Sequence, residues 1–389
     1  MIPYWRLSAY YFFYFSFVGA FSPFFAHYLQ SIALSATDIA VLMSLMQLMR
    51  VLAPNLWGWL AEKLGMRIAI VRLSALASLA GFSVFFMTTD FAGLFAAMAL
   101  MAFFWSAALP LIEGLAFAHL GEASHRYGSI RVWGSVGFIV AVLALGHSLD
   151  HLPIEAVLWV TATILGGIVL CSFFVPEAPR PPVQRETASF GDTLRRPEVQ
   201  ALFGACFLMS AAHGALYVFY SIYLVDIGYD KGLVGWMWTL GVLAEIVVFM
   251  WMPRLTRRFS LRAILLFSFA CAVGRFLMIG WGAHSLALLL FAQVLHGATF
   301  GAYHAAAIAA VNEWFPGRLQ SRGQALYGSL SFGAGGMLGG LLSGYTWEGI
   351  GPAWTYTIGA GFALAGLLWL SLGWKGEPGA AHALHEERR

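Results

Sequence analysis

Charged residues are scarce in this chain of 389 residues. Lys, Arg, Asp and Glu together make up 11% of it, whereas hydrophobic residues make up 60%. A soluble domain carries about 25% charged residues, because its exposed surface needs polar cover. The composition therefore excludes soluble enzymes, nucleic-acid-binding proteins and disordered proteins. A formal net charge of +3 is also too small to indicate a nucleic-acid partner.

Cysteine is scarce as well, and this limits the covalent and metal chemistry of the chain. Cys171, Cys206 and Cys271 are the three cysteines, and each lies inside an apolar run. A disulfide framework is therefore not expected. No cluster of carboxylate and thiolate side chains accompanies the histidines in the sequence, so we expect no metal site.

Long apolar runs dominate the rest of the sequence. A helix needs about 20 residues to cross the hydrocarbon core of a bilayer. The runs are continuous rather than alternating with a period of two, which favours helices over a barrel. Polar breaks separate twelve runs in two sets of six, near 8–30, 38–60, 68–88, 91–117, 128–148 and 154–175, then 198–225, 232–255, 261–281, 285–311, 323–345 and 352–374.

The basic residues indicate how these runs are oriented. The loops after runs 2, 4, 6, 8 and 10, together with the two ends, hold 18 of the 22 Lys and Arg residues. The opposite loops hold one, Lys231, and three lie within or at the edge of runs. Cytoplasmic loops carry the excess of basic residues. We therefore expect both termini in the cytoplasm.

The polar breaks also divide the chain into segments. Residues 1–176 form a predicted N-terminal six-helix bundle, and residues 198–376 form a C-terminal one. Between them, 177–197 is a predicted cytoplasmic linker, whose sequence PEAPRPPVQRE cannot be helical through its prolines. Residues 377–389 form a polar cytoplasmic tail. The predicted fold class is an all-α integral membrane protein with twelve transmembrane helices in two pseudo-symmetric bundles.

Two segments recur in the two halves. GAFSPFFAHYL from Gly19 aligns with GALYVFYSIYL from Gly214, at an offset of 195. YGSIRVWGSVG from Tyr127 aligns with YGSLSFGAGGM from Tyr327, at an offset of 200. Apolar helices can resemble one another by chance, but duplication also explains matches in register. Two six-helix repeats are typical of secondary transporters with a substrate site between the halves.

One loop motif carries a family resemblance. GWLAEKLGMR, between runs 2 and 3, resembles the signature of the major facilitator superfamily, in which acid and base form a cytoplasmic latch. The corresponding gating residues here are Gly58, Ala61, Glu62, Gly65 and Arg67. LPLIEGLA, YGSIRVWGSVGF, HGALYVFYSIY, LGVLAEIVVF and LHGATFGAYHAAA are similar to segments of the 3-phenylpropionate permease group, a branch related to the lactose permease and the nucleoside–proton symporters. The resemblance implies the major facilitator fold and a transport function.

Charged residues within the runs are the candidates for the transport site, because they are costly in hydrocarbon and mark pathways. Arg50, Glu113, Arg131, Glu245 and Arg275 fall there. Three Arg against two Glu favour an anionic substrate, whose carboxylate could be bound by Arg50 or Arg275 through paired hydrogen bonds. We also expect polar and aromatic side chains at the cavity, although helix packing is the alternative for each of Gln47, His213, Tyr217, Tyr220 and Trp236.

Glu113 and Arg131 are 18 residues apart, on consecutive runs joined by a short loop. In the lactose permease a Glu and an Arg at this spacing bind the sugar, so the resemblance implies a substrate-binding role for both. The alternative is a structural ion pair near the cytoplasmic end, because Arg131 lies only a few residues into its run.

Glu245, Arg275 and His296 fall in runs 8, 9 and 10, where the lactose permease uses the same residue types for proton coupling. His304 follows His296 by about two helical turns on one face. Thr299 stands where the lactose permease has a second carboxylate, so coupling would rest on Glu245 with His296. A static pair of Glu245 with Arg275 is the alternative.

Together these patterns predict a secondary active transporter with alternating access, which takes up a small organic anion, such as a phenylpropionate-like aromatic acid, with protons. Alternatives are a proton-driven exporter of drugs or metabolites and a sugar or nucleoside symporter. More remote are a membrane enzyme and a non-transporting sensor. The expected partners are the substrate, protons and the lipid bilayer, with the proton gradient in place of a cofactor. The sequence does not determine the oligomeric state, and a monomer is the default.

Overall fold

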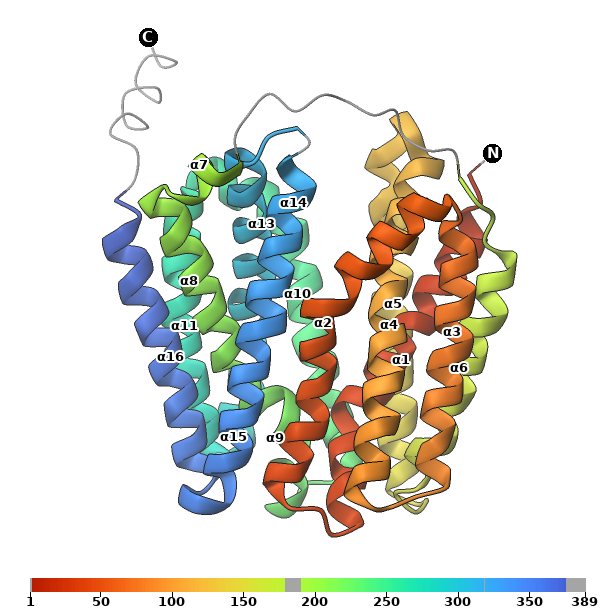
Figure 1. Cartoon of the computed structure of the whole chain (residues 1–389). Coiled ribbons are helices and arrows are strands. Elements are labelled where there is room, and N and C mark those ends of the chain that lie inside the picture. The colour runs from red at the N-terminus through yellow and green to blue at the C-terminus, as the bar shows by residue number, and fades with distance from the viewer. Residues whose placement is uncertain (1, 179–189, 318, 376–389) are drawn as a thin grey trace.

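The structure is a computed structural model of the whole chain, and it describes residues 2–178, 190–317 and 319–375. Within these ranges the secondary structure is helical, with no strand (Figure 1). Residues 179–189 of the predicted linker and residues 376–389, which include the predicted tail, lie outside the described residues.

Six membrane-crossing helices form the N-terminal half. They are α1 (Tyr4–Ser31), α2 (Ala36–Leu64), α3 (Arg67–Ser83), α4 (Phe91–Leu120), α5 (Tyr127–Leu149) and α6 (Ala156–Phe174). A 3₁₀ turn, Val84–Phe86, extends α3, and another, Gly121–Arg126, separates α4 from α5.

The C-terminal half is built from more, shorter pieces. After the short α7 (Phe190–Leu194), they are α8 (Pro197–Ala212), α9 (Gly214–Asp226), α10 (Lys231–Arg258), α11 (Leu261–Gly282), α12 (Leu286–Val294), α13 (Tyr303–Trp314), α14 (Leu319–Tyr327), α15 (Gly336–Ile350) and α16 (Pro352–Gly373). π-helical segments, Gly297–Ala302 and Gly328–Gly335, join α12 to α13 and α14 to α15.

The number of membrane crossings agrees with the twelve apolar runs. Eleven helical stretches in the described ranges are long and apolar enough to span a membrane, and the longest, of 59 residues, contains both α4 and α5. Dividing it at the 3₁₀ turn gives twelve spans. The seventh is α8 with α9, the tenth runs from α12 to α13, and the eleventh runs from α14 to α15.

Local sequence explains several helix ends. The Ser35 hydroxyl accepts a hydrogen bond from the backbone N–H of Asp38 and caps the start of α2, and Ser260 caps α11 in the same way through Ala263. Asp90 caps α4 through the N–H of Gly93. Gly65 ends α2 at φ 68°, a left-handed conformation that glycine adopts without steric cost.

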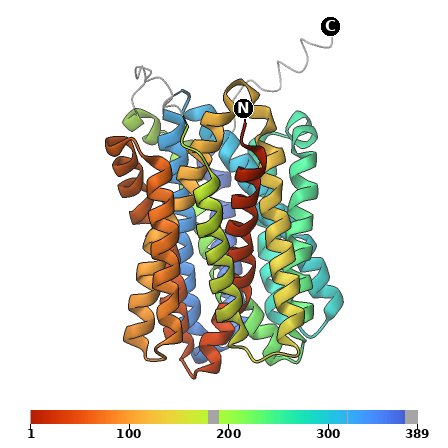
Figure 2. The ribbon, with the colours of Figure 1, turned by 90° about the vertical axis from the view of Figure 1, so that its right-hand side faces the viewer.

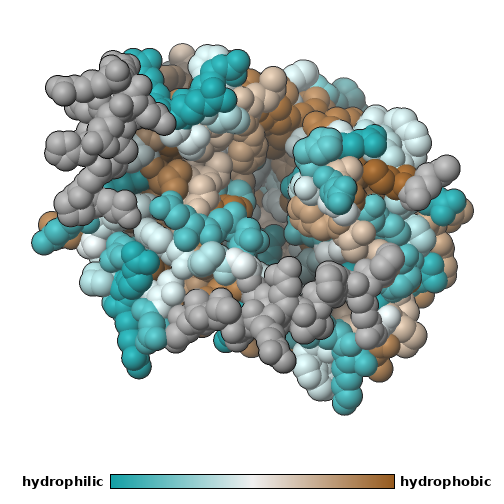
Figure 3. All heavy atoms as spheres, turned by 90° about the horizontal axis from the view of Figure 1, so that it is seen from above, coloured by the Kyte–Doolittle hydropathy of each residue, from teal (hydrophilic) through white to brown (hydrophobic). Residues whose placement is uncertain are grey.

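The two halves stand side by side, and all spans run between the same two ends of the molecule (Figures 1 and 2). α1 begins and α16 ends at one of these ends, which we call the terminal face. Seen from that side, the surface is hollowed between the two bundles (Figure 3). The halves contact each other through α1 with α9, α2 with α15, and α5 with α10.

Helix packing repeats between the halves. A Cβ on Gly137 in α5 would collide with the carbonyl oxygen of Phe12 in α1. A Cβ on Gly335, at the end of the second π-helical segment, would collide in the same way with the carbonyl oxygen of Phe207 in α8. Phe12 and Phe207 are 195 residues apart, which is the offset of the first sequence repeat. Gly137 and Gly335 are 198 residues apart, two fewer than the offset of the second repeat, so the same kind of close contact recurs between the first and fifth spans of each half with a small shift in register.

Candidate functional site

The candidate residues of the two halves face each other between the bundles. Arg131 in α5 lies within electrostatic reach of both Glu245 in α10 and His304 in α13. Arg50 in α2 lies within reach of Tyr14 in α1 and of Tyr217 in α9. Side chains separated widely in sequence thus share one region between the halves.

Glu245 and His296 form a direct contact. His296 Nε2 lies 2.7 Å from a carboxylate oxygen of Glu245, and both side chains are largely buried. The first π-helical segment brings the backbones together, because Gly297 packs against the carbonyl of Ala244 in α10. π-helical turns occur often at functional sites. His296 Nδ1 is buried and has no hydrogen-bond partner among the described residues.

Arg275 is held entirely by neutral groups. Its side chain is 1% exposed. Nε donates to the carbonyl of Ala292 at 2.8 Å, and one terminal nitrogen donates to the side-chain oxygen of Gln293 at 3.0 Å. The other donates to the hydroxyl of Thr299 at 3.1 Å and lies 3.4 Å from Nε2 of His213. Glu245 contacts His296 rather than Arg275. Thr299 stands at the position where the lactose permease has a carboxylate, and its hydroxyl accepts a hydrogen bond from Arg275.

Arg50 has a different environment from Arg275. It is half-buried, and the described part of the chain offers it no hydrogen bond or ion pair. Gln47 lies one helical turn before it in α2, and its side-chain oxygen is buried without a hydrogen-bond partner in the described residues. A guanidinium and an amide oxygen between the halves can therefore receive a ligand without first losing a protein partner.

Aromatic side chains border this region on both sides. The Tyr14 ring stacks on Trp105 of α4 at a centroid distance of 4.6 Å. In the other half, Tyr217 stacks on Trp238 at 6.2 Å and Tyr220 meets the same ring edge-on. Trp236 is half exposed. Trp238, two residues later, is the tryptophan that contacts Tyr217 and Tyr220.

Glu113 and Arg131 do not form an ion pair in the described structure. The hydroxyl of Tyr127 donates to Glu113 at 3.1 Å. The Arg131 guanidinium lies 3.8 Å from the centre of the Phe15 ring, a cation–π arrangement. Both charged side chains are half-buried.

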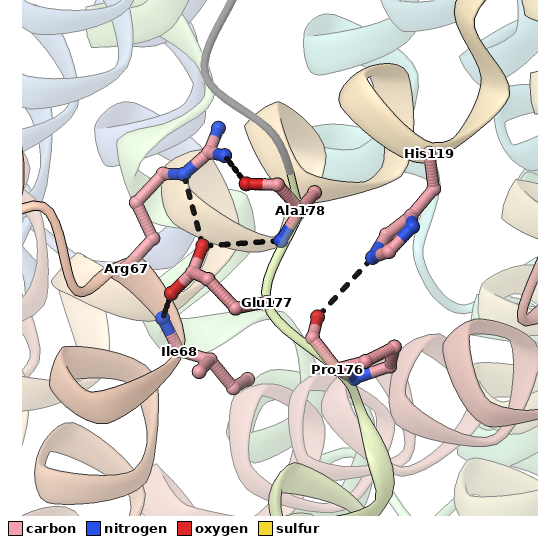
Figure 4. A network of polar contacts seen from close by, with 6 residues as sticks. All are labelled: Arg67, Ile68, His119, Pro176, Glu177 and Ala178. Atoms are coloured by element: carbon pink, nitrogen blue, oxygen red, sulfur yellow. Dashed lines mark hydrogen bonds and ion pairs between the residues drawn. The ribbon is translucent and has the colours of Figure 1, made fainter.

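The gating motif is tied to the end of the sixth span. Arg67 Nε donates to Glu177 at 3.3 Å, and another Arg67 nitrogen donates to the carbonyl of Ala178 at 2.7 Å (Figure 4). The second oxygen of Glu177 accepts from the backbone N–H of Ile68, in the first turn of α3. A nearby hydrogen bond joins His119 to the carbonyl of Pro176.

The remaining motif residues are more open. Glu62 is exposed and forms no ion pair among the described residues. Nothing lies within 4 Å of the place that a Cβ on Gly58 would occupy, whereas Ala61 is buried. Within the described residues, it is Arg67 and the start of α3 that join the motif to the end of the sixth span.

At the end opposite the terminal face, carboxylates form hydrogen bonds between the halves. Asp150, after α5, accepts from the backbone N–H of Lys231 at 2.9 Å and of Gly232 at 3.1 Å, at the start of α10. Glu348 in α15 accepts from the N–H of Ala36 at 2.8 Å, at the start of α2. In each case a carboxylate from one half caps a helix N-terminus of the other, where backbone N–H groups are otherwise unpaired.

Several residues of this site escaped the sequence reasoning. Asp150, Glu348, Tyr14 and Trp105 were not among the sequence candidates. The repeated Tyr127 and Tyr327 did carry a signal, since each begins the YGS match between the halves.

Comparisons with known proteins agree with this architecture. The model of the MFS_1 like family matches residues 4–358. A probable 3-phenylpropionic acid transporter of Escherichia coli (strain K12) is 29% identical over 355 residues, which cover 89% of this chain and 92% of that protein. A maltose permease of Geobacillus stearothermophilus is 28% identical and covers 87% and 86%.

Solved structures support the fold. A mutant of the nucleoside transporter NupG superposes with a TM-score of 0.84 at 18% identity, covering 95% of this chain and 99% of that chain. At this identity the likeness supports the fold alone. The family match spans most of the chain and its relatives are transporters rather than enzymes. The chain therefore belongs to the MFS_1 like family and is an integral membrane transporter with the major facilitator fold.

Proposed function

We propose that this transporter takes up a small organic anion, such as a phenylpropionate-like aromatic acid, together with protons. The substrate binds between the halves, and alternating access exposes it to each side of the membrane in turn. The protein lies in a bacterial cytoplasmic membrane with both termini in the cytoplasm. The terminal face is then the cytoplasmic face, and the conformation described is open inward.

Arg50 is the observation that carries the proposal. It places a positive charge between the halves without a carboxylate partner in the described residues. Arg275, the other cation considered for this role, already donates to neutral protein groups. A guanidinium binds a carboxylate through two parallel hydrogen bonds. The nearby stack of Tyr14 on Trp105 offers an apolar surface for an aromatic ring.

The similarity to the probable 3-phenylpropionic acid transporter supports the same substrate class. The protein's own charges also favour an anion, because no described residue forms an ion pair with Arg50, while Glu245 is already in contact with His296. A carboxylate substrate would supply the missing negative charge.

Proton coupling is assigned to Glu245 and His296. The two groups can share or exchange a proton at 2.7 Å, and both lie next to the region assigned to the substrate. Burial disfavours the charged form of each group, while nearby charges can restore it. Binding or release of a charged substrate would therefore change how firmly the pair holds its proton. The proton gradient supplies the energy, and no cofactor is required.

A neutral sugar or nucleoside is the second candidate. Glu113 is half-buried and bonded only through one oxygen to Tyr127, so its other oxygen can accept from a ligand hydroxyl. The maltose permease among the relatives agrees with such a ligand.

A thermal-shift screen of the purified protein against aromatic acids, sugars and nucleosides separates the two. We expect aromatic acids to raise the melting temperature of the wild type and to lose this effect in Arg50→Gln. Stabilisation by sugars or nucleosides alone, with no effect of Arg50→Gln, would contradict the proposed anion substrate.

A further inference from the structure

Tyr127 and Tyr327 occupy the same place in the two sequence repeats. Each begins a Tyr-Gly-Ser sequence. Tyr127 is the first residue of α5, in the fifth span, and Tyr327 is the last residue of α14, in the eleventh span. The fifth and eleventh spans are the equivalent members of the two halves.

The hydroxyl of Tyr127 contacts a charged side chain of the preceding span. It donates to Glu113 of α4 at 3.1 Å and lies 3.4 Å from the hydroxyl of Tyr11. Its ring stacks on Phe117, one helical turn after Glu113, at a centroid distance of 4.5 Å. The ring is thus fixed by packing, and the hydroxyl is directed at the carboxylate.

Tyr327 makes the corresponding contact in the other half. Its hydroxyl lies 2.9 Å from Nδ1 of His304, in α13 of the tenth span. Its ring packs edge-on against Phe332 at 5.6 Å, and the side chain is 3% exposed. As in the first half, the tyrosine of one span holds a titratable side chain of the span before it.

Sequence spacing alone points to a different partner for Tyr327. Glu313 precedes Tyr327 by 14 residues, just as Glu113 precedes Tyr127. Glu313 is exposed, however, and the hydroxyl contact is made by His304. The two tyrosines are therefore equivalent in their position in the fold. The side chain that each one contacts differs, because it is an acid in the N-terminal half and a base in the C-terminal half.

Both held side chains lie within electrostatic reach of Arg131. Glu113 and His304 are half-buried. His304 is within electrostatic reach of Arg131, which belongs to the opposite half and follows Tyr127 by one helical turn. A hydroxyl bound to one side of each group leaves its other side free for a ligand.

We propose that Tyr127 and Tyr327 are equivalent positioning residues that orient Glu113 and His304 toward the transported substrate. A Tyr327 hydroxyl that donates to Nδ1 of His304 keeps the imidazole proton on Nε2, which becomes a hydrogen-bond donor. Tyr127 occupies one oxygen of Glu113 and leaves the other as an acceptor. The site then offers one donor and one acceptor to a polar group of the substrate, and this part of the inference rests on the proposed transport function.

The first test needs no substrate. Nitrogen NMR of protein carrying isotope-labelled histidine reports the tautomer of each imidazole, and the signal lost in His304→Gln identifies His304. We expect Tyr327→Phe, which removes only the hydroxyl, to shift the Nδ1 signal of His304. Tyr345→Phe is the matched control, since Tyr345 lies in the same span and is 77% exposed. An unchanged His304 signal in Tyr327→Phe would overturn the proposed contact, whether or not the protein transports the expected substrate.

The second test measures transport in proteoliposomes. We expect Tyr127→Phe and Tyr327→Phe each to raise KM by about fivefold, the loss of one ordinary hydrogen bond, with the maximal rate and melting temperature unchanged. Tyr127→Phe should add nothing in a Glu113→Ala background, and Tyr327→Phe nothing in a His304→Ala background, because alanine offers the tyrosine hydroxyl no partner. Additive effects, or a lowered melting temperature without a change in KM, would show that the tyrosines only stabilise the fold. Absence of transport by the wild type would instead count against the proposed function.

Discussion

His296 Nε2 lies 2.7 Å from a carboxylate oxygen of Glu245, so the buried acid of α10 contacts an imidazole. Arg275, which could have neutralised that acid, donates instead to Ala292, Gln293 and Thr299. A carboxylate paired with an arginine would stay charged, because the arginine does not release its proton. A carboxylate paired with an imidazole shares its site with a second group that can gain or lose a proton.

Replacing Glu245 by Gln removes the acid while keeping the shape and a hydrogen-bond acceptor. We expect this variant to lose accumulation driven by a proton gradient and to retain exchange of substrate across the membrane, because exchange needs no net proton movement. Counterflow and gradient-driven uptake in proteoliposomes measure the two activities separately. Glu155→Gln is the control, since Glu155 is exposed in the loop before α6. Normal accumulation by Glu245→Gln would remove this residue from the coupling mechanism.

Arg50→Gln removes a cation that has no ion-pair partner in the described parts of the chain. Hydrogen bonds to a charged group contribute about 1.5–3 kcal/mol, so we expect affinity for an aromatic acid to fall by roughly 10- to 100-fold. Isothermal titration calorimetry measures this change directly. Arg257→Gln, at the exposed end of α10, should bind like the wild type. Equal affinity in Arg50→Gln and Arg257→Gln would place the carboxylate elsewhere.

Asp150 and Glu348 stabilise the end opposite the terminal face by capping helices of the opposite half. Loss of such a cap costs about 1 kcal/mol, so Asp150→Ala and Glu348→Ala should each shift the balance toward opening of this end by about fivefold. Spin labels at Thr89→Cys and His284→Cys, in the two halves at this end, report the separation in a cysteine-replaced background.

We expect a longer-distance population to grow in each single variant and to grow further when Asp150→Ala and Glu348→Ala are combined. Glu155→Ala, at the same end, should leave the distance distribution of the parent unchanged. A distribution that does not change in the combined variant would show that the caps contribute nothing to closure.

Gly335 packs against the backbone of Phe207, and an added methyl group has no space there. We expect Gly335→Ala to lower the stability by about 1–3 kcal/mol, as overpacking does, and to lower the melting temperature. Gly361→Ala in α16 is the matched control, because nothing lies within 4 Å of its Cβ position. Two variants with the same melting temperature would argue against tight packing at Gly335.

The number of spans could be predicted from the sequence because it depends on the length and polarity of the runs, whereas the major facilitator fold was predicted from the resemblance of its motifs. Apolar runs of about 20 residues can satisfy their backbone in lipid only as helices or closed barrels, so the twelve spans were visible in the polar breaks. The places where a helix is interrupted within a span were harder to predict. The seventh span divides at His213, and neither π-helical segment leaves a mark in hydropathy.

The contacts of the site were harder to predict. Glu245 and His296 are 51 residues apart, and membership of neighbouring spans does not say which rotation each helix adopts. Hydropathy cannot separate Trp236 from Trp238, although only the latter meets Tyr217 and Tyr220. Asp150 and Glu348 accept hydrogen bonds from backbone N–H groups of the opposite half. The residue that supplies such a group cannot be recognised from its side chain.

Uptake of radiolabelled 3-phenylpropionate by proteoliposomes tests the central claim most directly. With an imposed inward proton gradient, the wild type should concentrate the acid above its external level, and an uncoupler should collapse the accumulation. Entry that never exceeds equilibration with the external level, or accumulation that an uncoupler leaves intact, would contradict proton-coupled uptake of an aromatic acid.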